Sequence, residues 1–214
     1  MDESDPRPGS VAPALVREFG PLELWHSRVR VAGDALVEGR ERLGRLSGEF
    51  RPVQMVRENA GRAVLEPYRA FERGIGLDPS TPRTRVEYAA RESLPAGRLA
   101  STGAVPDALL AVLVMTGVPV WALDARRVDG DPALRTSEPG ERPGGRRRGS
   151  PLPAGSIVVA DAHAPLVLLL HDPPERLAGA RAREVVLYAV GVEGVPLVTV
   201  TEAVWTAARF LRAE

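Results

Sequence analysis

The sequence contains no cysteine and no lysine, so all 28 of its basic residues are arginine. Without cysteine, disulfides, thiol nucleophiles, zinc ribbons and iron–sulfur clusters are excluded. Without lysine, Schiff-base catalysis and the phosphate-binding lysine of a P-loop are excluded as well. Aromatic residues make up only 5% of the chain. No apolar run approaches the roughly 20 residues that are needed to span a bilayer.

The chain also lacks an excess of either charge, because 28 acidic residues balance the 28 arginines. Proteins that bind nucleic acid on their own usually show a basic excess. A hydrophobic content of 44% and a charged content of 26% over 214 residues are typical of one folded domain with a sizeable core. The opening residues, MDESDPRPGS, are acidic and have no apolar stretch, so we expect a cytoplasmic protein without a signal peptide or membrane contact.

The N-terminal half is dominated by helical patterns. Alternating apolar residues predict a strand over residues 22–31, and Asp34 can cap the helix that follows. A second helical pattern covers residues 53–73, where Pro67 should kink or divide it. Thr84 and Glu87 have the spacing of a capping box, which predicts a helix that starts at Thr84.

The C-terminal half changes from helices to strands. The apolar run over residues 108–115, which ends at Gly117, predicts a buried helix. Thr199 and Glu202 predict a capping box for a closing helix. Strands are predicted over residues 118–124, 132–136, 156–161, 165–171 and 184–190, of which the third and fourth form a hairpin. The whole pattern predicts an α+β fold.

Two segments contain no apolar periodicity. Residues 1–12 are expected to form a disordered tail, and residues 137–153, SEPGERPGGRRRGSPLP, a mobile loop. The remaining chain, residues 13–214, is expected to fold as a single domain.

Three blocks, in this order, resemble a known family. They are YRAFERGIGLDPSTPRTRVEYAARESLP (68–95), GVPVWALDARRVDGDPALRTSEPGE (117–141) and GSIVVAD (155–161). They look like the entry helix and "dP" loop, the Gly-x-Pro strand with its "G-D…L-R" turn, and the next strand of stand-alone B3/B4-domain proteins. This domain is best known as the editing domain of the phenylalanyl-tRNA synthetase β subunit, where it hydrolyses tyrosine wrongly attached to the tRNA for phenylalanine. The resemblance implies a single layered domain of β/β/α type.

The chain departs from the family at several polar positions. Asp107 matches an Asp-x-x-Asn segment of the family, but Leu110 replaces the asparagine. Trp121 replaces the histidine that the synthetase domains carry after Gly-x-Pro, and HDPPERLAG (171–179) replaces an arginine and a Ser-Asp cluster. The fold is therefore expected to be retained, while the substrate of the synthetase domain does not follow.

Three aspartates lie at the ends of predicted elements, namely Asp107, Asp124 and Asp161. We expect them to be catalytic, either as general bases or as anchors for a substrate ammonium group. The alternative is structural: Asp107 favours a helix N-terminus, and the other two form turns. The resemblance implies that Asp107 and Asp124 lie near one pocket.

Four further residues are expected to contact the substrate. Arg135 follows Asp124 across a short connection and could hold a carboxylate, phosphate or sulfate, or could form only a salt bridge. Together with Asp107 and Asp124 it is expected to line one cavity. Trp121 and Glu141 are included through the resemblance, since Glu141 matches the "G-E" position of the family. His163 follows Asp161 closely and is either its catalytic partner or an exposed turn residue.

No metal or cofactor is expected. His163 and His171 lie at opposite ends of one predicted strand and its turn, and His26 is distant in sequence. No pair has the spacing of a metal site, and no glycine-rich nucleotide fingerprint is present.

Three hypotheses for the function remain open at this point. The first is hydrolysis of an aminoacyl ester, aminoacyl-tRNA above all, in which Arg146–Arg148 could contact phosphates. The second is an enzyme of secondary metabolism that closes a small nitrogen ring on an amino-acid-derived substrate and expels an anion, with or without a partner protein. The third is a binding subunit without catalysis.

Overall fold

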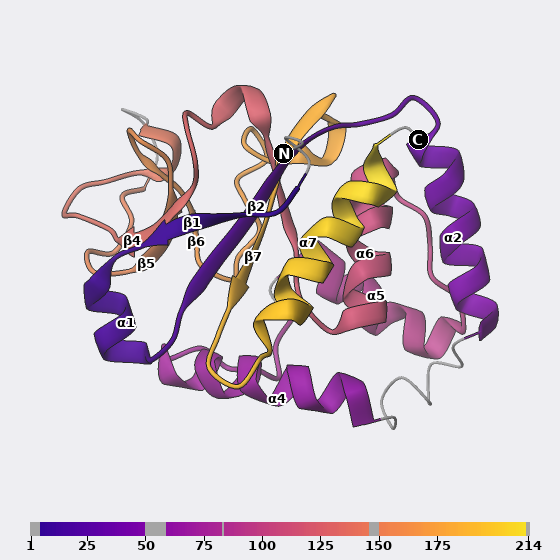
Figure 1. Ribbon diagram of the computed structural model, residues 1–214, viewed down its shortest axis with the longest axis horizontal. Coiled ribbons are helices and arrows are strands. Elements are labelled where there is room, and N and C mark those ends of the chain that lie inside the picture. The colour runs from indigo at the N-terminus through magenta and orange to yellow at the C-terminus, as the bar shows by residue number, and fades with distance from the viewer. Residues whose placement is uncertain (1–4, 50–58, 83, 146–149, 213–214) are drawn as a thin grey trace.

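The computed structural model describes residues 5–49, 59–82, 84–145 and 150–212 (Figure 1). Its strands are β1 (Arg7–Val11), β2 (Glu23–Arg30), β3 (Trp121–Asp124), β4 (Ala133–Thr136), β5 (Ile157–Ala160), β6 (Pro165–Leu168) and β7 (Glu184–Gly191). Its α-helices are α1 (Pro13–Phe19), α2 (Ala35–Glu49), α4 (Asn59–Gly74), α5 (Arg85–Ala96), α6 (Ala104–Thr116) and α7 (Leu197–Leu211). Short 3₁₀ turns are η1 (Ala125–Arg127), η2 (Pro143–Gly145) and η3 (Gly179–Arg181).

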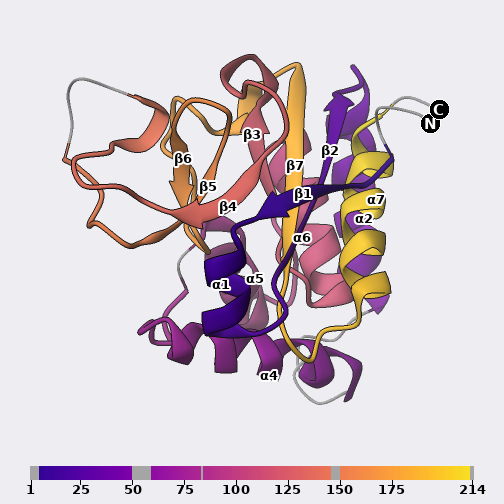
Figure 2. The same ribbon diagram turned by 60° about the vertical axis from the view of Figure 1, so that its left-hand side comes forward.

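The seven strands form one curled sheet in the order β3-β7-β2-β1-β4-β5-β6. All neighbouring pairs are antiparallel except β1 and β4, which are parallel. Helices α2, α6 and α7 lie on one side of β2 and β7, and strands β4–β6 lie on the other (Figure 2). The molecule therefore has a layered α+β architecture, with the helices early, the strands later and a closing C-terminal helix, as the sequence predicts.

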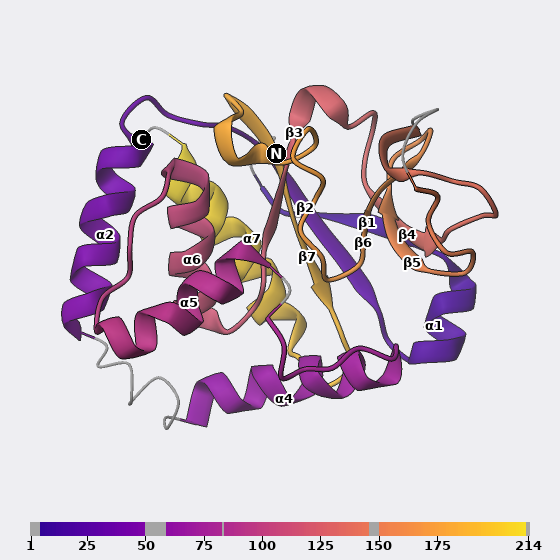
Figure 3. The same cartoon turned by 180° about the vertical axis from the view of Figure 1, so that it is seen from behind.

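The core lies where these layers meet. Strand β7 is buried over its entire length from Val185, between its neighbours β2 and β3 and under helix α7. Helix α6 is surrounded by α2, α5 and α7, seen from behind in Figure 3. Its residues Ala108–Val112 are all buried, which explains why this helix is apolar on every side. No helix in the described ranges combines the length and apolar character needed to cross a bilayer.

Local hydrogen bonds explain the helix ends that the sequence predicts correctly. The Thr84 hydroxyl accepts a hydrogen bond from the Glu87 amide at 3.1 Å, and the Glu87 carboxylate accepts one from the Thr84 amide at 3.2 Å. This is the predicted capping box. Gly117 ends α6 in the left-handed conformation, with φ of 73°, again as predicted.

The predicted tail over residues 1–12 is wrong for residues 7–11, which form strand β1 between β2 and β4. This strand is held by backbone pairing and not by an apolar side-chain pattern. A Cβ atom on Gly9 would lie 2.5 Å from the Pro132 carbonyl oxygen and 2.7 Å from the Leu24 side chain, so glycine permits the close approach. Helix α1, which follows at Pro13, was not predicted either.

Two helices differ in detail from their predictions. Helix α7 begins at Leu197 after Pro196, with no side-chain cap, so the predicted capping box at Thr199 is wrong. The Thr199 amide already donates to the Pro196 carbonyl at 2.9 Å, which places Thr199 inside the first turn. Helix α4 continues through Pro67 without being divided. The first part of the predicted 53–73 helix lies outside the described residues.

Part of the segment 137–153 is held together by its own hydrogen bonds. The Ser137 hydroxyl donates to the Pro153 carbonyl at 2.7 Å, and the Leu152 amide donates to the Glu141 carbonyl at 2.7 Å. The run Arg146–Arg148 lies outside the described residues.

Candidate functional site

A pocket of about 720 Å³ opens beside the turn between β5 and β6. Its polar residues come from η1 and the connection to β4, from the β5–β6 turn, and from the segment before η3. Its apolar floor consists of Val128, Leu166 and Leu177, all buried. The polar lining residues are Arg126, Arg127, Asp129, Asp161, His163 and Arg176. A pocket with an apolar floor and a few convergent polar groups is typical of a small-molecule site.

A close contact between the side chains of His163 and Asp129 joins two loops at this pocket. The Nε2 atom of His163 lies 2.5 Å from Oδ2 of Asp129, although both side chains are largely exposed, at 74% and 67%. An exposed pair of this kind contributes little to folding. Both residues line the pocket, which makes the pair a candidate for chemistry there.

Asp161 holds both members of this pair in place. One carboxylate oxygen accepts the amides of His163 and Ala164, each at 2.9 Å, and the other accepts the amide of Asp129 at 3.1 Å. The Ala162 amide also donates to the Asp129 carbonyl at 3.2 Å. The Asp161 side chain is therefore committed to backbone donors, and it fixes the loops that carry His163 and Asp129.

Arginines form the other wall of the pocket. Arg126 donates from Nε and Nη2 to the Asp124 carboxylate at 3.1 and 2.8 Å, and these hydrogen bonds lower the pKa of Asp124. Arg127 makes no ion pair with any carboxylate in the described part of the chain. Arg176 donates to the Pro143 carbonyl and lies so close to Gly144 that a Cβ there would be 2.6 Å from its Nη1. Asp124 therefore neutralises Arg126, and Arg127 is the member of this wall whose charge no ion pair offsets among the described residues.

The structure brings only two of the predicted site residues, Asp161 and His163, into this pocket. Asp124 contacts it through Arg126. Asp107, Asp124 and Arg135, which were expected to share one cavity, do not line this pocket. Each of them has a separate set of partners.

Asp107 is a structural residue of the α6 N-terminus. Its side chain is 1% exposed, and its carboxylate accepts hydrogen bonds from the Ser101 hydroxyl at 2.5 Å and from the amides of Thr102 and Gly103 at 2.8 and 3.2 Å. Gly39 of α2 packs against it, because a Cβ there would lie 3.2 Å from that of Asp107. The carboxylate joins the 101–103 segment to α6, so its structural alternative is the better interpretation.

Arg135 and Glu141 bind each other. Two nearly parallel hydrogen bonds of 2.8 and 2.7 Å join the guanidinium to the carboxylate. The Glu138 amide adds a third donor to Glu141 at 2.7 Å. Hydrogen bonding from Arg135 lowers the pKa of Glu141, so the pair is ionised and neutralises itself. It fastens the start of the 137–153 segment to β4, and neither residue lines the pocket beside the β5–β6 turn.

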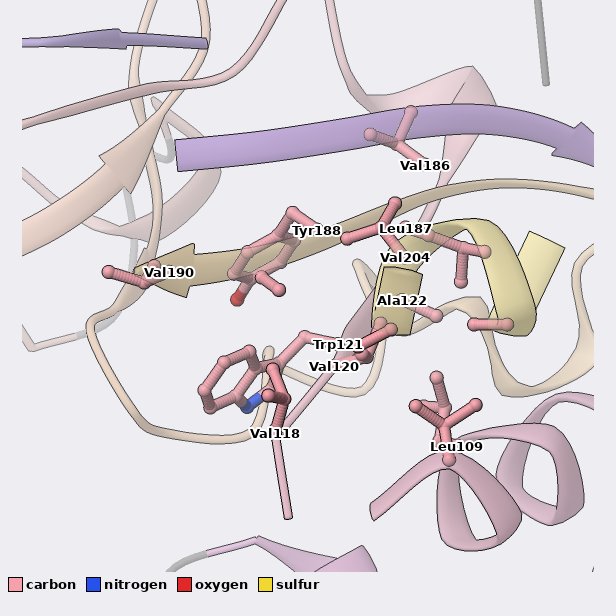
Figure 4. Close-up of a cluster of buried hydrophobic side chains, with 14 of the residues drawn as sticks. Leu109, Val118, Val120, Trp121, Ala122, Val186, Leu187, Tyr188, Val190 and Val204 are labelled. Atoms are coloured by element: carbon pink, nitrogen blue, oxygen red, sulfur yellow. The ribbon is translucent and has the colours of Figure 1, made fainter. Parts of the chain in front are cut away.

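Trp121 lies in the interior, stacked on Tyr188 of β7 (Figure 4). The ring centroids are 5.4 Å apart and the planes differ by 13°. Both residues are buried, and neither the Trp121 Nε1 nor the Tyr188 hydroxyl has a hydrogen-bond partner among the described residues. Burial of a polar atom without a partner costs free energy, so the Trp121 Nε1 and the Tyr188 hydroxyl lower the stability of the fold.

Two further residues lie in register with Trp121 and Tyr188 across the sheet. His26 of β2 is opposite Tyr188, and Arg7 of β1 is opposite His26. His26 is 5% exposed, and its Nε2 lies 3.7 Å from the exposed carboxylate of Asp131, beyond hydrogen-bond distance. Burial lowers the pKa of His26; Asp131 opposes this shift, and Arg7 and Arg28 reinforce it.

This shift predicts a loss of stability in weak acid. A histidine whose pKa is lower in the folded than in the unfolded chain binds fewer protons when folded, so stability falls as the pH drops below about 6.5. Thermal unfolding followed by circular dichroism between pH 7.5 and 5.5 should show a smaller decrease in melting temperature for His26→Gln than for the wild type. An equal decrease in both proteins contradicts this assignment.

Sequence reasoning missed three residues with unusual surroundings. Asp129 lies between the predicted strands 118–124 and 132–136, and Arg176 belongs to the HDPPERLAG segment, which has no periodic signal. In the same segment, burial raises the pKa of Asp172, whose carboxylate accepts the Arg85 amide at the start of α5 at 2.8 Å. Only the short Asp-x-His spacing of 161–163 could have pointed to the pocket.

Among the described residues, no group of three His, Asp or Glu side chains is arranged to hold a metal ion. No protein-family model matches this sequence, and a search of curated proteins finds no match. The function must therefore be argued from the pocket and from the motifs in the sequence.

Proposed function

We propose that this protein is an enzyme that hydrolyses an aminoacyl ester at the pocket formed by η1 and the β5–β6 turn. The observation that carries the proposal is the His163–Asp129 pair, which Asp161 fixes at the edge of an arginine-bearing pocket. A histidine oriented by a carboxylate is a common general base. The base and the anion-binding groups lie in the same pocket, as ester hydrolysis requires.

The proposed reaction uses the free nitrogen of His163. With Nε2–H donated to Asp129, the Nδ1 lone pair takes a proton from water as the water oxygen bonds to the ester carbonyl carbon. The ester C–O bond then breaks, and the proton passes from His163 to the departing alcohol oxygen. The products are a free amino acid and the alcohol. Asp129 is a positioning residue here, because it acts through His163.

The arginines suit a substrate that carries phosphate. Arg126, Arg127 and Arg176 line the same pocket as His163. Guanidinium groups bind phosphate oxygens in two-pronged geometry. An aminoacyl-tRNA presents its ester next to a phosphodiester chain, so this wall supports tRNA as the carrier of the ester, in a cytoplasmic setting.

The sequence resemblance supports the same reaction class. The block 117–141, which resembles the B3/B4 strand and turn, contributes Arg126, Arg127 and Asp129 to the pocket. The block 155–161 contributes Asp161. The motifs that led to the family therefore supply most of the polar residues on which the proposal rests.

A second reaction is favoured by the density of arginines. With three guanidinium groups in one pocket, a sulfate or phosphate leaving group would be well held. A substrate amine would attack the carbon that bears this group, so that a C–N bond forms and a C–O bond breaks. His163 would take the ammonium proton, and the arginines the anion. The product would be a small nitrogen ring.

One survey of substrates tests both reactions. The full-length protein is incubated with a panel of aminoacyl-tRNAs, including tyrosine on the tRNA for phenylalanine, and with amino acids that carry a sulfate or phosphate ester. We expect release of free amino acid from an aminoacyl-tRNA above the rate in buffer. Release of sulfate or phosphate with a ring product, detected by mass spectrometry, would replace the first reaction by the second. Activity on neither class would overturn both and leave a binding subunit.

A further inference from the structure

A second pocket, of about 310 Å³, lies among α2, α6 and α7, on the helical side of the sheet. The residues that line it are Glu38, Arg42, Arg45, Leu46, Met115, Arg209, Phe210 and Arg212. Four of these are arginines, and Glu38 is the only acid among them. A chain with no net charge has here gathered an excess of positive charge in one small pocket.

Arg42 is partly buried, whereas Arg45 and Arg209 are exposed. Its guanidinium lies flat over the Phe210 ring, with Cζ 3.6 Å from the ring centroid, and its side chain is only 15% exposed. Its Nη1 has no acceptor among the described residues. Its Nη2 is 3.8 Å from the Glu38 carboxylate, which is too long for a hydrogen bond. The Arg42 guanidinium is thus partly buried without a full set of hydrogen-bond acceptors, which costs free energy.

The neighbouring cations make this arrangement costlier. Burial lowers the pKa of Arg42, and the charges of Arg45 and Arg209 lower it further, against the opposing effect of Glu38. Arg209 lies over the Trp205 ring at 5.1 Å, so it too is placed by an aromatic ring. Like charges held together by packing are stabilised when an anion binds between them.

We infer that this pocket binds an oxyanion, a phosphate or sulfate group carried on a small organic molecule. The guanidinium groups of Arg42, Arg45 and Arg209 supply donors for the oxygens. Leu46 and the half-exposed Met115 supply an apolar wall for the carbon part of the ligand. The volume admits a small molecule and not a macromolecular segment. This site shares no lining residue with the His163 pocket, so it stands independently of the proposed reaction.

Titration calorimetry with phenyl phosphate and with inorganic phosphate, at matched ionic strength in chloride, tests this inference. We expect saturable binding at one site, tighter for phenyl phosphate because of the apolar wall. Equal affinity for the two probes would assign the site to the free anion. Absence of saturable binding of either probe would overturn the inference.

Two exposed arginines provide variants that leave the packing of Arg42 intact. Arg45→Gln and Arg209→Gln should each weaken phenyl phosphate binding about tenfold or more, because each removes a charged donor. Arg40→Gln is the matched control, since Arg40 is exposed on the same helix as Arg45 but does not line the pocket. An equal loss in Arg40→Gln would show non-specific attraction and overturn the inference.

Discussion

Replacing His163 by glutamine should reduce ester hydrolysis by about 100-fold or more, the usual effect of removing a general base. The amide of glutamine can still accept and donate hydrogen bonds but cannot take a proton from water. The melting temperature should not change, because the His163 side chain is largely exposed and its contact with Asp129 contributes little to folding. Initial rates of amino-acid release and thermal unfolding are the two measurements.

The control for this variant is His171→Gln. His171 lies three residues beyond the end of β6, and its Nδ1 is 2.8 Å from the Leu169 carbonyl oxygen. It does not line the pocket. Full activity in His163→Gln, or an equal loss in His171→Gln, would remove His163 from the proposed reaction.

Replacing Asp107 by alanine should lower stability by about 2–4 kcal/mol, the usual cost of leaving several buried groups without partners. Three donors would lose their acceptor, namely the Ser101 hydroxyl and the amides of Thr102 and Gly103. For a chain of this length the melting temperature should fall by roughly 5–15 °C. Hydrolytic activity measured well below the melting temperature should be retained.

Asp107→Asn separates this structural role from a catalytic one. Its amide oxygen can accept the two backbone amides, and its amide nitrogen can donate to Ser101, so most of the stability should be kept. If Asp107→Ala instead keeps the melting temperature of the wild type but loses activity, Asp107 is a catalytic residue.

The parts of the fold that could be predicted are those fixed by neighbours in sequence. The capping box of Thr84 and Glu87 closes within four residues, and its hydrogen bonds form as the spacing predicts. The same spacing at Thr199 and Glu202 fails, because helix α7 has its N-cap at Pro196, three residues before Thr199. A local motif is therefore decisive only where no stronger start signal precedes it.

Strand β1 could not be predicted from an apolar pattern in the sequence. Residues Arg7–Val11 alternate between partly buried and exposed positions, with no buried apolar side chain among them. Their place between β2 and β4 depends on backbone groups of strands that follow much later in the chain. A polar strand of this kind is not distinguishable from a tail until its partners are known.

The candidate site illustrates the same limit. Asp161 and His163 are two residues apart, so their association could be expected from the sequence. Asp129 reaches them only because β4 and β5 pair antiparallel, which brings the start of one strand beside the end of the other. Arg135 and Glu141 have the right chemistry for a substrate anion, but they satisfy each other.

A double-mutant cycle on the rate of aminoacyl-ester hydrolysis tests the central claim most directly. The account predicts that His163→Gln lowers kcat/KM about 100-fold and that Asp129→Asn lowers it about tenfold, since Asp129 only orients the base. It also predicts that the double variant is no slower than His163→Gln, because two residues that act as one unit lose their function once. Full activity in Asp129→Asn, or two losses that multiply in the double variant, would contradict it.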